Sequence, residues 1–326
     1  MGLHPGIIFL VGLVIIIVGA ELMLRGAARV ATLLGIKPIV IGLTVVSIGT
    51  SMPELAVGIT AVTEGKGPLA VGNIAGANII NILLILGLSA LIRPLPVHSL
   101  SVRLDVPVMV AASLALVAMA WDGVLSRAEG MVMLGAAVAY TFALVRLSRG
   151  ESAALRREFA EEYSAALIPK TFISSGAWNS LLLFVGLAVT VLGADLLVSG
   201  AIDLARDYGV SDAVIGLTIV AIGTTAPELA TTLMATFKNE RDVAIGNLIG
   251  SSIYNILVIL GMTCMAARGG IDVSDEILRI DLPLAAAVAL VCLPVFTSDR
   301  MVSRLEGGLF VAAYLLYLSM LLFIRA

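Results

Sequence analysis

The chain has 326 residues, of which 60% are hydrophobic and only 13% are charged, and its formal net charge is −3. Soluble domains carry about a quarter charged residues, so this composition excludes an ordinary soluble protein and indicates an integral membrane protein. The small net charge says little about partners, because local Lys and Arg bias, rather than the total charge, orients membrane proteins.

Ten apolar runs are long enough to cross a bilayer, and short turns with charged residues, Gly or Pro separate them. They lie at 5–34, 37–62, 69–91, 103–120, 126–147, 176–205, 210–235, 243–265, 279–296 and 304–325. The runs are too long for barrel strands and do not alternate, so the sequence predicts an all-α membrane protein with ten transmembrane helices. Gly6 to Ala20 lacks a basic leader and a small-residue cleavage site, so we expect a retained first helix.

The distribution of basic residues predicts the orientation of these helices. With the loops assigned to alternate sides, one side receives only Lys66, Arg127, Arg206, Arg268, Arg279 and Arg325 out of the twenty Lys and Arg residues. The positive-inside rule places the other, more basic side in the cytoplasm. We therefore expect a multi-pass protein of the plasma (inner) membrane with both termini on the outer side.

The two halves of the chain repeat each other. Residues 12–81 align with 186–255 at a constant offset of 174 without a gap, and the offset becomes 176 and then 177 further on. Five helices per half is an odd number, so the second half enters the membrane from the opposite side. The sequence thus predicts two inverted five-helix repeats, 1–147 and 176–326, an arrangement typical of transporters. The charged segment 148–175 is expected to be a cytoplasmic linker with a short surface helix.

The repeated motif places an acid directly after a proline. IGTSMPEL (48–55) contains Glu54, and IGTTAPEL (222–229) contains Glu228. A charged residue at the bilayer centre costs about 2.5–3.5 kcal/mol, and such residues usually face an ion path. Pro53 and Pro227 cannot donate a hydrogen bond, so we expect helices 2 and 7 to be broken there, with backbone carbonyls released.

Oxygen ligands surround each of these acids in the sequence. Thr50 and Ser51 stand four and three residues before Glu54, and Thr224 and Thr225 stand in the same relation to Glu228. Carboxylate, hydroxyl and carbonyl oxygens are the ligands that Ca²⁺ prefers. The next helices, GNIAGANIINIL (72–83) and GNLIGSSIYNIL (246–257), contain Gly-x-x-x-Gly and can pack closely.

Other polar residues of the spans have structural explanations. Asn73, Asn78 and Asn247 are equally well explained by hydrogen bonds between helices. Asp105 and Asp281 stand at helix starts and are expected to act as caps, and Glu21 and Asp195 are expected to have interfacial or packing roles. Cys264 and Cys292 are expected to be buried apolar residues without a disulfide or zinc site. No Lys, Arg or His lies in the middle of a predicted span to pair with Glu54 or Glu228.

The two motifs, 42–83 and 216–257, resemble in order and in both halves the repeats of the cation/calcium exchanger superfamily, specifically its prokaryotic sodium/calcium exchanger branch. The resemblance implies the ten-helix layout and secondary antiport of Na⁺ against Ca²⁺. Both ions would be substrates, with no cofactor and no enzymatic activity. The bilayer would be the main partner, and the monomer would be the functional unit.

The resemblance also implies a set of site residues. Glu54 and Glu228 would be the carboxylates shared by Ca²⁺ and Na⁺, and the remaining ligands would come from Thr50, Ser51, Thr224, Thr225, Asn81, Asn255, Ser251 and backbone oxygens at Ser47 and Ala221. Ala77 stands at a position where the family usually has Ser. The missing hydroxyl would alter one sodium site. Asn255 stands where potassium-dependent relatives carry Asp, which disfavours potassium coupling.

Three alternatives remain open at this point. Exchange of Ca²⁺ or another divalent cation for H⁺ could use the same carboxylates. A cation channel is disfavoured because channels usually build charged rings from several subunits, whereas this duplication is inverted within one chain. An intramembrane enzyme is disfavoured because no Ser/His pair or two-Asp site lies at depth in the sequence.

Overall fold

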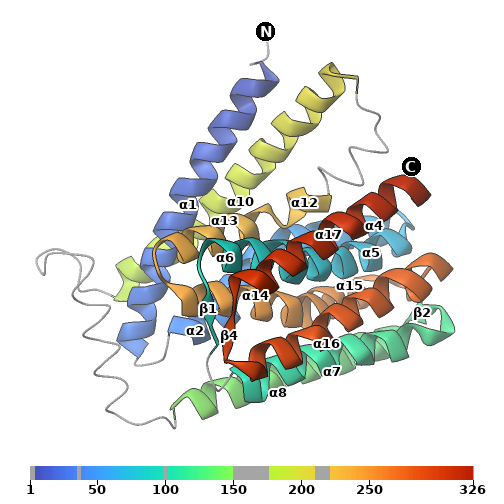
Figure 1. The fold of residues 1–326 in the computed structure, drawn as a ribbon. Helices are drawn as coiled ribbons and strands as arrows, with labels where there is room; N and C mark the ends of the chain where they lie inside the picture. Colours follow the sequence, from blue (N-terminus) through green and yellow to red (C-terminus); the bar gives the residue numbers. More distant parts are fainter. Residues whose placement is uncertain (1–3, 35–37, 98–100, 150–175, 210–220, 326) are drawn as a thin grey trace, which may run out of the picture.

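The computed structural model describes residues 4–34, 38–97, 101–149, 176–209 and 221–325, and most of them are helical (Figure 1). Within these residues, nine helical stretches are long and apolar enough to cross a membrane. They are Pro5–Ala31, Ile39–Thr63, Gly67–Ile92, Ser101–Asp122, Arg127–Leu147, Gly176–Asp207, Arg241–Ala266, Ile277–Ser298 and Arg304–Phe323. The expected span 210–235 is described only from residue 221, and residues 150–175 of the expected linker 148–175 lie outside the described residues. The chain is therefore a mostly helical, multi-pass membrane protein.

The described helices and short strands of the second half occur in the same order as those of the first half. The first half contains α1 (Pro5–Leu34), α2 (Pro38–Ile41), η1 (Gly42–Val46), α3 (Ser47–Thr50), α4 (Met52–Thr63), α5 (Gly67–Ile79), η2 (Ile80–Leu86), α6 (Gly87–Ile92), β1 (Leu95–Pro96), η3 (Ser101–Asp105), α7 (Val106–Met119), η4 (Ala120–Asp122), β2 (Val124–Leu125) and α8 (Arg127–Arg149). The second contains α10 (Gly176–Asp207), α12 (Ala221–Thr224), α13 (Ala226–Phe237), α14 (Arg241–Tyr254), η6 (Asn255–Leu260), α15 (Gly261–Ala266), β3 (Ile271–Asp272), η7 (Ile277–Asp281), α16 (Leu282–Ser298), β4 (Met301–Val302) and α17 (Arg304–Arg325).

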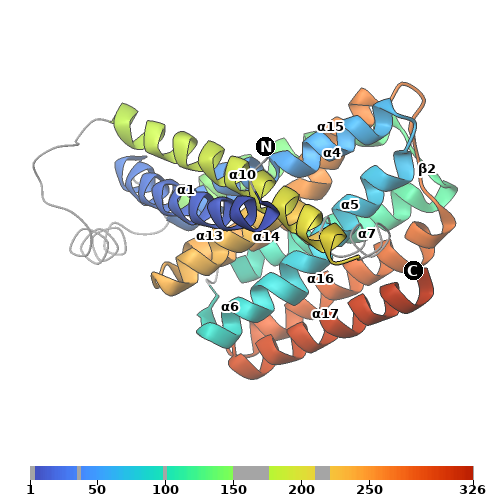
Figure 2. The ribbon, with the colours of Figure 1, turned by 90° about the horizontal axis from the view of Figure 1, so that it is seen from above.

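Helices α1 and α10 lie side by side, as both views show (Figures 1 and 2). A Cβ on Gly12, Gly19 or Gly26 would overlap the backbone of Leu197, Thr190 or Leu183, respectively, and one on Gly186, Gly193 or Gly200 would overlap that of Met23, Ile16 or Phe9. As the residue number on α1 increases, the number of the residue contacted on α10 decreases, so the two helices are antiparallel. Glycine at every seventh position of both helices allows this backbone approach.

Two short antiparallel ladders join the halves at opposite ends of α7 and α16 (Figure 1). Leu95 pairs with Val302 in one ladder, and Leu125 pairs with Ile271 in the other. Each ladder contains one strand from each half, and the duplication maps the residues of one ladder onto those of the other. The short strands thus tie the two halves together at both ends of the bundle.

The centre of the molecule is formed by the helices that follow the two acidic motifs. In the most apolar window of the stretch Arg241–Ala266, 94% of residues are buried, and in that of Gly67–Ile92 the share is 78%. The corresponding share for Arg304–Phe323 is only 17%. The stretches α5–η2 and α14–η6 are therefore surrounded by other helices, whereas α17 turns most of its surface outward.

The expected capping role of Asp105 and Asp281 is wrong. Neither side chain bonds to the backbone at its helix start, because π-helical segments η3 and η7 continue directly into α7 and α16. Instead, Tyr140 Oη donates to Asp105 Oδ1 at 2.9 Å, and Tyr317 Oη donates to Asp281 Oδ1 at 3.4 Å. Each acid thus anchors a tyrosine of the last helix of its own half, Tyr140 in α8 or Tyr317 in α17. The two cysteines, by contrast, are buried and free as expected.

Candidate cation site

In both acidic motifs a single residue interrupts the helix. This residue lies directly before the helix segment that contains the proline. Between α3 and α4, Ser51 has φ −82° and ψ 10°, and between α12 and α13, Thr225 has φ −89° and ψ 9°. These angles lie in the sparsely populated bridge region of backbone space. Pro53 and Pro227 then occupy the first turn of the new helix, where a missing N–H costs nothing. The expected helix breaks are therefore present at both motifs.

Glu54 and Glu228 lie in the first turns of α4 and α13, respectively, and neither side chain is exposed. The N-terminus of a helix carries a partial positive charge, which favours a carboxylate at that position. Ser51, three residues before Glu54, bonds to Glu228, so both carboxylates belong to one buried region. Among the described residues, neither forms an ion pair with Lys, Arg or His, so no described basic side chain neutralises the two carboxylates.

The two halves exchange hydrogen bonds across the site. Ser51 Oγ donates to Glu228 Oε1 at 3.0 Å. Thr50 Oγ1 lies 3.4 Å from Asn247 Oδ1, and the duplicated contact joins Thr224 Oγ1 to Asn73 Oδ1 at the same distance. Each hydroxyl comes from the break in one half, and each acceptor comes from the other half. The site is therefore assembled by both halves together.

Several buried polar atoms of this region have no hydrogen-bond partner among the residues that the structure describes. They are both carboxylate oxygens of Glu54, Glu228 Oε2, both amide atoms of Asn81, Asn255 Oδ1, Ser251 Oγ and Asn73 Nδ2. A buried polar group without a partner costs about 1–3 kcal/mol, and a charged one costs more. Most of these atoms are oxygens, which is what a hard cation requires. The geometry is thus suited to a cation that would complete the missing interactions.

Some predicted ligands already have structural hydrogen bonds. Ser47 Oγ donates to the carbonyls of Gly42 at 2.6 Å and Asn247 at 3.0 Å, and Thr225 Oγ1 donates to the carbonyl of Ile222 at 3.0 Å. A donating hydroxyl can still offer lone pairs to a cation. Ala221 is the first residue of α12, and its side chain lies outside the described residues.

The site is not symmetric, although the sequence is duplicated. Asn247 Nδ2 donates to Thr232 Oγ1 at 3.1 Å. The position that corresponds to Thr232 in the first half is Gly58, and Asn73 Nδ2 has no partner. Likewise Ser51 reaches the carboxylate of the other half, whereas its counterpart Thr225 bonds to its own helix. These differences leave Glu54 as the less saturated of the two carboxylates.

Asn78 is an additional structural residue of the site. Its Nδ2 donates to the carbonyl of Ser252 at 3.0 Å, and its Oδ1 accepts from Asn255 Nδ2 at 3.1 Å. Asn78 therefore makes the bond between helices that the sequence offered as one explanation, and it also holds a predicted ligand. The π-helical geometry at Asn81 and Asn255 had no signal in the sequence, although π-helical turns often occur at functional sites.

No group of three or more His, Cys, Asp or Glu side chains in the described part of the chain could hold a metal ion. A cation between Glu54 and Glu228 would therefore take its other ligands from hydroxyl, amide and backbone oxygens. Such a mixed, oxygen-only set suits Ca²⁺ and Na⁺ better than Zn²⁺, which favours nitrogen and sulfur.

Comparison with known proteins places the chain among ion exchangers. The family model described as sodium/calcium exchanger protein matches residues 4–146 and 178–323. The chain is 39% identical over 313 residues to the putative antiporter CaxA of Alkalimonas amylolytica, covering 95% of this chain and 96% of the relative. It is 30% identical over 348 residues to the sodium/calcium exchanger MaX1 of Methanosarcina acetivorans, covering 98% of each chain.

A solved structure shows the same fold. The sodium-calcium exchanger NCX_Mj, soaked with Na⁺ and Sr²⁺, superposes with a TM-score of 0.82 at 28% identity, covering 98% of this chain and 99% of that one. The extent of these matches supports transport of cations by antiport in a membrane. The chain belongs to the sodium/calcium exchanger family.

Proposed function

We propose that this chain exchanges Na⁺ for Ca²⁺ at one shared site between Glu54 and Glu228. The observation that carries the proposal is the pair of fully buried carboxylates without a basic partner in the described residues. Two such charges in a membrane protein are tolerable when cations neutralise them. The remaining ligands are Thr50, Ser51, Thr224, Thr225, Asn81, Asn255, Ser251 and the backbone oxygens of Ser47 and Ala221.

Charge balance makes the two ions competitors. The carboxylates together carry −2, which one Ca²⁺ cancels and which two or more Na⁺ cancel or exceed. A neutralised site can be closed off from water at a much lower free energy than an empty one. Transport is then restricted to loaded states, which enforces exchange and suppresses leak. With three Na⁺ per Ca²⁺, each cycle would respond to voltage at about 2.3 kcal/mol per charge per 100 mV.

The proposed architecture is ten helices in two inverted five-helix repeats, with the linker 148–175 in the cytoplasm and both termini on the outer side of the plasma (inner) membrane. The antiparallel glycine contacts of α1 with α10 and the paired ladders support this arrangement. Alternating access would move α1 and α10 together past the core that holds the site. These two helices contribute no ligand, and one chain supplies the complete site, so the monomer is the proposed functional unit.

The experiment is ⁴⁵Ca²⁺ uptake into vesicles that contain the purified protein, with imposed gradients of Na⁺, H⁺ or K⁺. The proposal expects an outward Na⁺ gradient to drive uptake and K⁺ to have no effect. Uptake driven by a pH gradient and unaffected by Na⁺ would replace Na⁺ with H⁺ as the coupling ion. Passage of many ions in one opening, instead of one exchange per transport cycle, would identify a channel and overturn antiport.

A further inference from the structure

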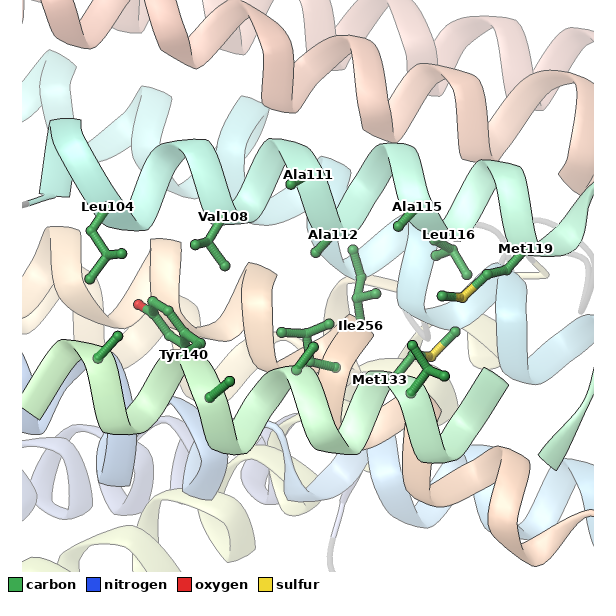
Figure 3. A pocket seen from close by; sticks show the side chains of 15 residues that line it. Leu104, Val108, Ala111, Ala112, Ala115, Leu116, Met119, Met133, Tyr140 and Ile256 are labelled. Atoms are coloured by element: carbon green, nitrogen blue, oxygen red, sulfur yellow. The ribbon is translucent and has the colours of Figure 1, made fainter. Parts of the chain in front are cut away.

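An apolar groove of about 440 Å³ lies between α7 and α8 (Figure 3). One wall contains Ala111, Ala112 and Ala115 of α7, and the other contains Ala139 and Tyr140 of α8. Both helices belong to candidate membrane spans. Because these side chains are small, the groove runs along the outer surface of the bundle, in the region that the acyl chains of a bilayer would surround.

The groove extends inward to the segment η6, which also carries the predicted cation ligand Asn255. Ile256 and Leu257 form the floor of the groove, and they directly follow Asn255 in the π-helical segment η6. The wall residue Tyr140 donates its hydroxyl to Asp105, and its ring centre lies 5.8 Å from that of Tyr254. An occupant of the groove would therefore press on the segment that carries a predicted cation ligand.

The duplication provides a built-in comparison for this groove. The positions in α16 and α17 that correspond to Ala112, Ala115, Met133, Ala139 and Ala143 are occupied by Val288, Val291, Phe310, Leu316 and Met320. Every one of these side chains is larger than its counterpart in the first half. At two other lining positions, Leu116 and Met119, the second half has the smaller residues Cys292 and Val295, so the added bulk of the second half lies at the five positions compared here.

Two exposed arginines stand at one end of the groove. Arg103 directly precedes the lining residue Leu104, and Arg146 stands one turn after the lining residue Ala143. Neither forms an ion pair with any residue that the structure describes. In the second half, the counterpart of Arg103 is Arg279, which lies 3.4 Å from Asp275, and the counterpart of Arg146 is Phe323. Among the described residues, the two arginines without an ion pair at this end of the groove therefore belong to the first half.

We propose that this groove binds an anionic phospholipid, with one acyl chain between α7 and α8 and the phosphate headgroup at Arg103 and Arg146. Basic residues at the end of a transmembrane groove are a recognised mode of binding anionic headgroups. In the proposed orientation both arginines face the cytoplasm, so the lipid belongs to the inner leaflet. The site is separate from the cation ligands, and binding of the lipid does not depend on which ions the protein exchanges.

The test uses native mass spectrometry of the full chain, released from nanodiscs that contain equal amounts of phosphatidylglycerol and phosphatidylcholine with identical acyl chains. The wild-type protein should retain one phosphatidylglycerol in preference to phosphatidylcholine. The double variant Arg103→Gln/Arg146→Gln should bind phosphatidylglycerol about thirtyfold more weakly, because each arginine contributes about fivefold to the affinity. Ala139→Leu, which installs the residue of the other half, should also displace the lipid.

Two matched variants serve as controls. Arg279→Gln removes one basic charge from the corresponding end of the second half, and Ala313→Leu adds the same bulk on the outer face of α17. Both should retain the lipid as the wild type does. Equal retention of the two lipids, or unchanged retention in the arginine double variant, would overturn the proposal. The arginines are exposed, so their replacement tests the idea even where Ala139→Leu lowers the yield of folded protein.

Discussion

Ser51 donates a hydrogen bond of 3.0 Å to Glu228, a residue 177 positions further along the chain. A hydroxyl at the helix break of one half thereby contacts the carboxylate of the other half. Two further break hydroxyls, those of Thr50 and Thr224, contact the amide oxygens of Asn247 and Asn73 in the other half. Both halves therefore contribute polar groups to the region around the two acids.

Neutralising either acid should abolish Ca²⁺ transport. Glu54→Gln and Glu228→Gln each remove one negative charge and keep the shape of the side chain, so the protein should remain folded. The loss of a charged ligand from a buried site costs several kcal/mol, so ⁴⁵Ca²⁺ uptake into vesicles should fall at least about hundredfold. Asp195→Asn, which neutralises an exposed acid of α10, is the matched control and should transport normally. Substantial uptake by Glu54→Gln would show that one carboxylate suffices.

Restoring the missing hydroxyl should change the response to Na⁺. Ala77 is buried in α5 at the position that corresponds to Ser251, whose hydroxyl has no hydrogen-bond partner. Ala77→Ser adds one more oxygen near the acids, so the Na⁺ concentration for half-maximal exchange should shift more than that for Ca²⁺. Ala75→Ser, an equally buried alanine that faces away from that side of the helix, is the control. Identical Na⁺ curves for Ala77→Ser and the wild type would remove residue 77 from the list of ligand positions.

The close approach of α1 and α10 should depend on their glycines. A Cβ on Gly19 would overlap the backbone of Thr190, so Gly19→Ala should force the helices apart and lower stability by about 1–3 kcal/mol. The same change at Gly135 of α8 meets no atom within 4 Å and should be neutral or stabilising by up to about 1 kcal/mol. Thermal unfolding in detergent and exchange activity in vesicles measure the difference. Equal melting temperatures for the two variants would contradict the backbone contact.

Glu240 predicts a pH dependence of stability outside the spans. Burial raises the pKa of this carboxyl above its ordinary value, with Lys238 lowering the pKa and Glu21 raising it, and Oε2 has no partner. A raised pKa means that the folded state holds the proton more tightly. Stability is therefore highest below the unfolded-state pKa and is lost as the pH rises through the folded-state pKa.

Glu240→Gln removes this titration, so the variant should lose less stability than the wild type as the pH rises above the ordinary pKa of a glutamic acid, about 4. Glu64→Gln, an exposed acid in the corresponding turn of the first half, should leave the wild-type profile unchanged. Melting temperatures measured across this range provide the comparison. A wild-type profile for Glu240→Gln would show that Glu240 is already neutralised by Lys238 in the folded protein.

The sequence predicts the parts of this site that depend on repetition and on backbone chemistry. The breaks at Ser51 and Thr225 follow from proline, and the burial of Glu54 and Glu228 follows from their place in apolar runs. Both features could be recognised in the sequence because each occurs in both halves at the constant offset of 174 residues. The central position of the helices that carry Asn81 and Asn255 likewise follows from their Gly-x-x-x-Gly motifs.

Other features depend on tertiary contacts and could not be predicted. The bond from Asn247 to Thr232, and the unpaired Nδ2 of Asn73, arise because Gly58 replaces the threonine of the other half. The π-helical segments at Asn81 and Asn255 occur at the same Asn-Ile-Leu of both halves, but the apolar pattern there also fits an ordinary α-helix and does not distinguish the two. The capping role expected for Asp105 was wrong because a partner in another helix, Tyr140, competes for the carboxylate.

Equilibrium binding of ⁴⁵Ca²⁺ to the purified chain at increasing Na⁺ tests the shared site most directly. The account predicts one Ca²⁺ per chain, complete displacement by Na⁺ with a Hill slope above one, and no detectable Ca²⁺ binding to the double variant Glu54→Gln/Glu228→Gln. Simultaneous binding of both ions without competition, or undiminished Ca²⁺ binding to the double variant, would contradict it.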